Sequence, residues 1–73
     1  MNWHSIIEGY PARANKSYLI WVRAEHSGYE FWQQSYFGGV DEEVPQFRVS
    51  GRTLASYGWT LIAWAKVERY KEA

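Results

Sequence analysis

The sequence contains no cysteine, only two prolines and no excess of charge of either sign. Without cysteine, the chain can form neither a disulfide bond nor a thiolate metal site. The absence of disulfides fits the reducing cytoplasm, where we expect this protein to work. Eight basic and eight acidic residues give a formal net charge of zero. Because released counterions supply much of the affinity for nucleic acids, this balance argues against a nucleic-acid partner.

Long apolar runs and catalytic motifs are lacking too. No run approaches the ~20 residues of a membrane helix, and residues 1–8 have neither the basic stretch nor the apolar core of a signal peptide. Two histidines, His4 and His26, are too few for a metal site of three or four ligands. The serines have no nucleophile signature, and Gly38-Gly39 is not followed by a phosphate-binding motif. We therefore expect no enzyme activity, no cofactor, no metal and no membrane association.

Aromatic residues, in contrast, are abundant: the 73 residues include five Trp, six Tyr and three Phe. Each ring can bury roughly 150–250 Å². A single domain of this size is close to the lower limit for an unaided core, so aromatic packing is the stabilising device that remains. The rings fall on both faces of the predicted strands, which leaves some of them for a partner.

Two strands and their connection can be predicted from residue type. Residues 18–22 are β-branched and aromatic, and residues 29–37 alternate between apolar and polar. The polar residues 25–28 suit a hairpin turn between them, so we predict an antiparallel pair. Glycines, acidic residues and a proline predict a loop over residues 38–45. A short edge strand over 47–49 and a turn over 50–52 follow.

The last element is ambiguous, because residues 59–67 fit both a strand and a helix. We predict a strand up to about Trp64, followed by an exposed tail with or without a helical turn. Residues 53–57 indicate no definite element.

These elements predict one mostly β domain over residues 1–73, a small antiparallel sheet or partly open barrel of three to four strands. A β-rich α+β arrangement with one short helix is the alternative. The expected core consists of the most apolar strand positions: Ile6, Leu19, Ile20, Trp21, Val22, Phe31, Trp32, Leu61, Ile62 and Trp64.

Three short motifs resemble a known family. The chain opens with Trp3-His4-Ser5-Ile6 and Tyr10-Pro11, continues with the strand Tyr18-Leu19-Ile20-Trp21-Val22, and closes with Leu61-Ile62-Ala63-Trp64. In order and spacing, these motifs resemble those of the domain-of-unknown-function-551 family of small phage and prophage proteins. The family's proline-rich end is replaced here by Ala65-Lys66-Val67-Glu68-Arg69. The resemblance implies a small β-rich fold and a phage or prophage origin, but no activity. Together with the cytoplasmic location expected above, such an origin predicts a place in the cytoplasm of the host cell.

The function predicted from these features is a non-enzymatic accessory protein that binds another protein, with a host or defence protein as the target. Asp41, Glu42 and Glu43 form the only acidic cluster, which is either solvated or a contact for a basic surface. We predict that partner contacts come from this cluster and from exposed rings, that is, from Asp41, Glu42, Glu43, Tyr36, Phe37 and Tyr57.

Two alternatives remain open. The first is a single-stranded nucleic-acid binder that stacks bases on Tyr18, Trp21 and Trp32 beside Arg23. The second is a self-assembling protein, a homodimer in the simplest case, that needs no external target. For every ring, the competing interpretation is that it belongs to the core.

Overall fold

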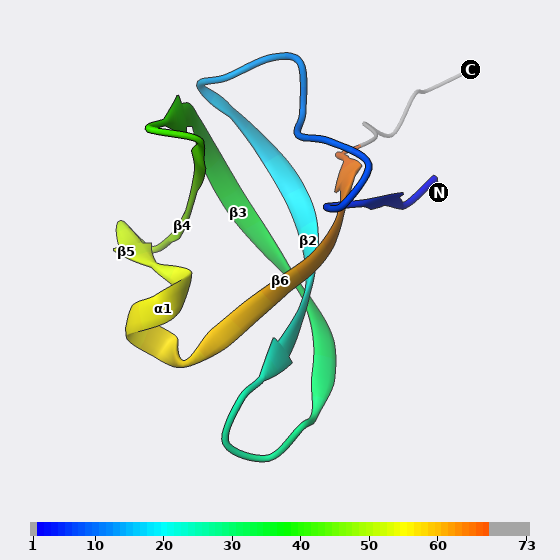
Figure 1. Cartoon of the computed structure of the whole chain (residues 1–73), viewed down its shortest axis with the longest axis vertical. Coiled ribbons are helices and arrows are strands. Elements are labelled where there is room, and N and C mark those ends of the chain that lie inside the picture. Colours follow the sequence, from blue (N-terminus) through cyan, green and yellow to red (C-terminus); the bar gives the residue numbers. More distant parts are fainter. Residues whose placement is uncertain (1, 68–73) are drawn as a thin grey trace, which may run out of the picture.

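A six-stranded antiparallel sheet, strongly twisted, makes up most of the computed structural model, which describes residues 2–67 (Figure 1). The strand order is β1-β6-β2-β3-β4-β5. The elements are β1 (His4–Ser5), β2 (Lys16–Ala24), β3 (Glu30–Asp41), β4 (Val44–Val49), β5 (Arg52–Thr53), the single helical turn α1 (Leu54–Tyr57) and β6 (Trp59–Lys66). The predicted mostly β, antiparallel class is confirmed. The count exceeds the predicted three to four strands because β1 and β5 have only two residues each, too few to show a periodicity.

The predicted hairpin forms the centre of the sheet. β2 and β3 pair in register over eight residue pairs, from Lys16 opposite Phe37 to Arg23 opposite Glu30. Side chains alternate between the two faces of a strand. Tyr18, Ile20 and Val22 therefore share one face, which is buried, and the residues between them point to the other face. We call the buried side of the sheet the inner face.

The predicted loop over residues 38–45 is wrong, because β3 continues to Asp41 and β4 begins at Val44. The chain reverses over Glu42 and Glu43 alone, which both have positive φ angles (48° and 66°), as a tight two-residue hairpin turn requires. The glycines at 38 and 39 lie inside β3, where the pairing with β4 shifts between Phe37 and Val40. They accommodate an extra residue in the strand rather than a loop.

Residues 47–49 form a strand as predicted, but this strand is not at the edge of the sheet. The chain turns at Ser50 and Gly51, both with positive φ, so that β5 pairs with Arg48 and Val49. α1 follows at once. The Thr53 side chain accepts a hydrogen bond from the Ser56 backbone N–H (3.3 Å) and caps the first turn.

The strand prediction for the last element is confirmed, and β6 runs two residues beyond Trp64 to Lys66. It pairs with β2, and the register shifts between Trp21 and Val22. Because β6 has one extra residue there, Leu61 and Trp64 both lie on the inner face although their positions differ by an odd number. The predicted tail beyond residue 67 lies outside the described residues.

The core fills the inner face. It consists of Tyr18, Ile20, Val22, Phe37, Phe47, Val49 and Trp64, with Ile6, Phe31, Leu54, Tyr57, Trp59 and Leu61 packed against it. Leu19, Trp21 and Ile62 are half-buried and are not part of this core, so their prediction as core residues is wrong. The prediction of Trp32 as a core residue is also wrong, because its side chain is 60% exposed on the opposite side of the sheet.

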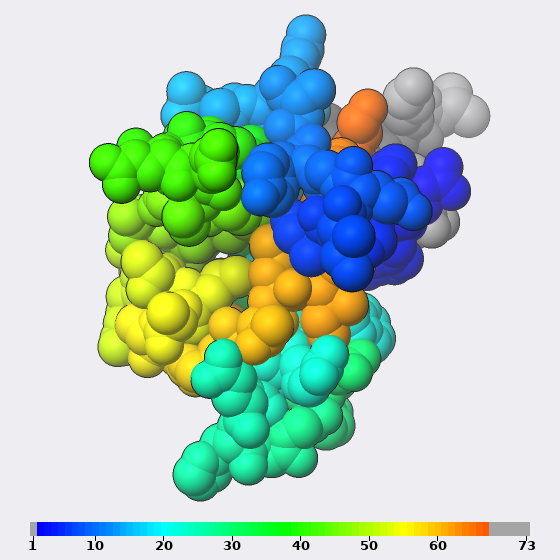
Figure 2. Space-filling model, viewed as in Figure 1, coloured from blue at the N-terminus to red at the C-terminus, as the bar shows by residue number. Residues whose placement is uncertain are grey.

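β1 pairs with β6 at the other edge, with His4 opposite Trp64. The segment between β1 and β2 then arches across one end of the sheet (Figure 1), and its blue surface lies against the orange surface of β6 (Figure 2). Within the described residues, no helix has the length and apolar character needed to cross a membrane.

Candidate functional site

An aromatic row crosses the side of the sheet that faces away from the core. Trp21 on β2 and Trp32 on β3 are directly opposite each other in the register, and Tyr36 follows along β3 on the same side. Trp32 is 60% exposed and Tyr36 47% exposed. Trp3, which precedes β1, packs edge-on against Trp21 with ring centroids 5.8 Å apart and is 38% exposed. We call Trp3, Trp21, Trp32 and Tyr36 the outer aromatic face.

Polar groups at the border hold two of these rings in place. The Trp21 indole N–H donates to a carboxylate oxygen of Glu30 (2.8 Å). The second oxygen of Glu30 lies 3.6 Å from Arg23, in the one ion pair formed among residues 2–67. The Tyr36 hydroxyl donates to the side-chain oxygen of Asn15 (3.2 Å). Rings that are already oriented lose less conformational freedom when a partner binds.

The predicted partner-contact residues are not brought together. Tyr36 lies on the outer aromatic face, as a contact residue requires. Asp41, Glu42 and Glu43 lie at the β3–β4 turn, at the other end of β4 from α1 (Figure 1). The acidic cluster is exposed there.

Two of the predicted contact rings are used by the fold. Phe37 is only 1% exposed, so its prediction as an exposed contact is wrong: it follows Tyr36 in β3 and therefore points to the inner face, against Phe47. Tyr57 is half-buried and stacks on Trp59 with centroids 4.4 Å apart. Its hydroxyl donates to the Val49 carbonyl (3.0 Å), which ties α1 to the end of β4.

The alternative nucleic-acid set is divided in the same way. Trp21, Trp32 and Arg23 do lie on one face. Tyr18 is 2% exposed on the inner face, where it packs edge-on against Phe37 and Trp64. Tyr18 and Trp21 are three positions apart in β2, and an odd separation places two side chains of a strand on opposite faces.

Trp3 and Asn15 are the members of the site that the sequence did not indicate. Trp3 is separated from Trp21 by 18 positions and reaches it only because β1 is added at the edge of β6. The available signal was the tryptophan itself, in a short apolar entry segment. Asn15 precedes β2 in a left-handed conformation (φ 57°), and its role as an acceptor for Tyr36 had no local signal.

The histidines are far from forming a metal centre. His4 stacks on Trp64 with centroids 4.5 Å apart, and His26 lies in the exposed turn between β2 and β3. Within residues 2–67, no three side chains of the His, Cys, Asp and Glu types are grouped so that they could hold a metal ion.

Comparison with known proteins adds no relative. No family model matches the chain, and no similar curated protein or solved structure was found. The resemblance to the domain-of-unknown-function-551 family therefore stays a prediction, and the case for a function depends on the outer aromatic face.

Proposed function

We propose that this chain is a non-enzymatic protein that binds a partner protein through its outer aromatic face. The observation that carries the proposal is the position of three tryptophans on the side of the sheet opposite the core. Tryptophan, tyrosine and arginine are enriched where proteins bind one another, and a few such residues supply most of the binding energy. Here Trp21 and Trp32 form the centre, with Trp3 and Tyr36 beside them.

The partner chemistry follows from the composition of the face. Its centre is apolar and broad, while Arg23 and Glu30 neutralise each other at the border. Such a surface suits a protein with an apolar patch and a weakly charged rim. A fully buried ring covers only roughly 150–250 Å², and Trp3, Trp32 and Tyr36 are 38–60% exposed. The four rings therefore offer less than the about 800 Å² that each partner buries in a stable interface. We therefore infer that the contact extends along β3 towards the acidic turn at Asp41, Glu42 and Glu43.

A single strand of nucleic acid is the second candidate, because Trp21, Trp32 and Arg23 share the face. Stacked bases would need nearby cations for the phosphates. Arg23 is engaged by Glu30, and within residues 2–67 the other cation beside the row is Arg48, opposite Tyr36 on β4. Because the face has several rings but few cations to hold phosphates, a protein is favoured over a nucleic acid as the partner.

The setting of this function is part of the proposal. The motifs at Trp3–Ile6 and Leu61–Trp64 support an origin in a phage or prophage, and the absence of cysteine supports action in the host cytoplasm. An accessory protein of this kind would bind a host or defence protein. The chemistry of the face does not depend on this setting.

The test is site-specific photocrosslinking from within the face. A benzophenone amino acid at Gln34, which is exposed between Trp32 and Tyr36 on β3, keeps all four rings intact. The matched control carries the same amino acid at Ser27, exposed in the β2–β3 turn. In a bacterial host lysate, position 34 is expected to give one dominant protein adduct, which Trp32→Ala removes, and position 27 none.

Each other result counts against the proposal in a defined way. An adduct that survives Trp32→Ala would show that the ring takes no part in binding. A nuclease-sensitive adduct would favour the nucleic-acid candidate. An adduct between two copies of this chain, with a dimer in sedimentation, would replace the external partner with self-association.

A further inference from the structure

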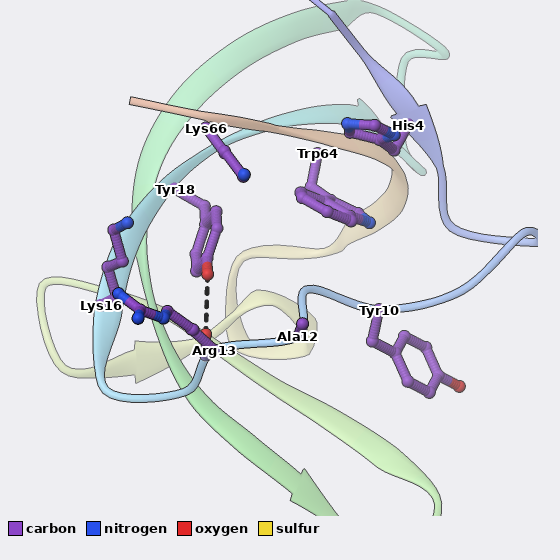
Figure 3. Close-up of a pocket in the computed structure, with 8 residues that line it drawn as sticks. All are labelled: His4, Tyr10, Ala12, Arg13, Lys16, Tyr18, Trp64 and Lys66. Carbon is purple, nitrogen blue, oxygen red and sulfur yellow. Dashed lines mark hydrogen bonds between the residues drawn. The ribbon is translucent and has the colours of Figure 1, made fainter. Parts of the chain in front are cut away.

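A separate pocket lies on the inner side of the sheet, at the end where the segment before β2 arches over it. Its volume is about 450 Å³, within the range of small-molecule sites. It is lined by His4, Tyr10, Ala12, Arg13, Lys16, Tyr18, Trp64 and Lys66 (Figure 3). This pocket shares none of its residues with the outer aromatic face.

The pocket is basic although the chain is neutral. Arg13, Lys16 and Lys66 are three of the eight basic residues of the chain, and no described acidic residue lines the pocket. The register explains why both lysines lie beside Tyr18. Lys66 on β6 is paired with Tyr18 on β2, and Lys16 lies two positions before Tyr18 on the same face. The two lysine side chains therefore lie on the inner face, at the end of the core.

Figure 3 shows the three cationic side chains on two sides of the Tyr18 ring. In this view Lys66 extends from β6 towards Tyr18 and Trp64, whereas Lys16 and Arg13 lie on the opposite side of the Tyr18 ring. The Lys16 amine is 6.0 Å from the centroid of that ring. Three cations around one opening are suited to an anion with several oxygens, such as a phosphate group.

The floor and the wall of the pocket are rigidly connected. Tyr18 and Trp64 form the floor and pack edge-on, with centroids 5.6 Å apart. The Tyr18 hydroxyl donates to the Arg13 carbonyl (2.7 Å), and the Trp64 indole N–H donates to the Gly9 carbonyl (3.0 Å). These two hydrogen bonds attach the segment before β2, which forms the wall of the pocket, to the core at Gly9 and at Arg13. Arg13 is also one of the three cations. The pocket is shaped before a ligand arrives.

An aromatic ring completes the lining. His4, which also lines the pocket, is exposed and has one ring face stacked on Trp64, so that Trp64 fixes the orientation of the imidazole. A flat heterocycle can stack on such a ring, as nucleic-acid bases stack on aromatic side chains in proteins that bind single strands. Tyr10 is directed away from the other lining side chains (Figure 3).

We propose that this pocket binds a small phosphate ester that carries a planar ring, the chemistry of a mononucleotide. The phosphate is held by Lys16, Lys66 and Arg13, and the ring stacks at His4. A mononucleotide fits better than a long strand, because one phosphate needs only the local cations, whereas a strand needs a basic surface that a neutral chain does not offer. The inference is independent of the proposed function, since the two surfaces share no residue.

The experiment is an NMR titration of the ¹⁵N-labelled full chain with AMP. Expected shift changes are confined to the pocket residues, including the Trp64 indole N–H, and the outer aromatic face is unaffected. Lys66→Gln and Lys16→Gln should each weaken AMP binding about tenfold, the loss of one charge-assisted contact. Arg48→Gln removes the same charge from the far side of the sheet and should leave the affinity unchanged. Because all three side chains are exposed, the variants should keep the fold.

Titrations with two other ligands show which part of AMP the pocket recognises. Inorganic phosphate should bind at least tenfold more weakly than AMP; equal binding would overturn the role of the ring. Oligothymidylate with a 5′ phosphate should bind no better than the mononucleotide. The proposal fails if only the strand binds, if AMP causes no shifts at low salt, or if Arg48→Gln weakens binding as much as Lys66→Gln.

Discussion

Trp21 and Trp32 face each other across β2 and β3 on the side of the sheet opposite the core. Their neighbours in sequence, Ile20 and Val22 on one strand and Phe31 on the other, belong to the core or pack against it. The sheet therefore has aromatic residues on both sides. One side holds the core, and the other is the side through which we propose that a partner binds.

Removing a ring should lower the free energy of unfolding much more on the inner side of the sheet than on the outer side. Phe37→Ala should lower the free energy of unfolding by about 3–5 kcal/mol, because it leaves a cavity in the core. Trp32→Ala should lower it by less than about 1 kcal/mol, the range of a cross-strand pair on an exposed face. Urea denaturation of both variants measures the difference. Equal losses would mean that Trp32 is part of the core.

Glycine at position 43, in the β3–β4 turn, should make the protein more stable than the native glutamate does. Glu43 adopts a left-handed conformation (φ 66°), which costs a residue with a side chain about 1–2 kcal/mol. Glu43→Gly removes that cost but makes the unfolded chain more flexible, so we expect a net gain of about 0.5 kcal/mol. The midpoint of urea denaturation measures it.

The control for this turn is Glu43→Ala, which removes the same charge without relieving the backbone. It should give no gain. If Ala stabilises the protein as much as Gly does, repulsion among Asp41, Glu42 and Glu43 is the cause, and the backbone explanation is wrong.

The extra residue in β6 should be essential. Deletion of Ile62 would place Leu61 and Trp59 on the opposite face from Trp64, because one residue reverses the alternation of a strand. We expect the deletion to abolish cooperative thermal unfolding. Ile62→Val keeps the register and should cost only about 0.5–1.5 kcal/mol. A deletion variant that melts cooperatively near the temperature of the parent chain would contradict this role.

How much the sequence could predict depended on the range of the interaction. Residues 18–22 and 29–37 showed strand composition directly, so the central hairpin was predicted correctly. The choice of strand over helix for residues 59–64 was also correct. The bulge that aligns Leu61 with Trp64 had no local signal, because it depends on pairing with Trp21 and Val22 some forty positions earlier.

The candidate site was harder to predict for the same reason. Alternation puts Phe37 and Tyr36 on opposite faces, but it does not say which face is buried. That depends on where β4 and β6 place Phe47 and Trp64. Glycines and acidic residues at 38–43 indicated a loop, although two positive φ angles at Glu42 and Glu43 suffice to turn the chain. Trp3 reaches Trp21 only through the addition of β1 at the edge.

The most direct test of the central claim is the affinity of the crosslinked partner, purified, for Trp32→Ala and for Tyr29→Ala. Tyr29 is also exposed, but it stacks on Phe31, whose ring packs against the core on the inner side of the sheet. By isothermal titration calorimetry, Trp32→Ala should weaken binding about thirtyfold or more, as a central interface residue does, and Tyr29→Ala should change it by less than about twofold. Equal affinities of the two variants would contradict a binding role for the outer aromatic face.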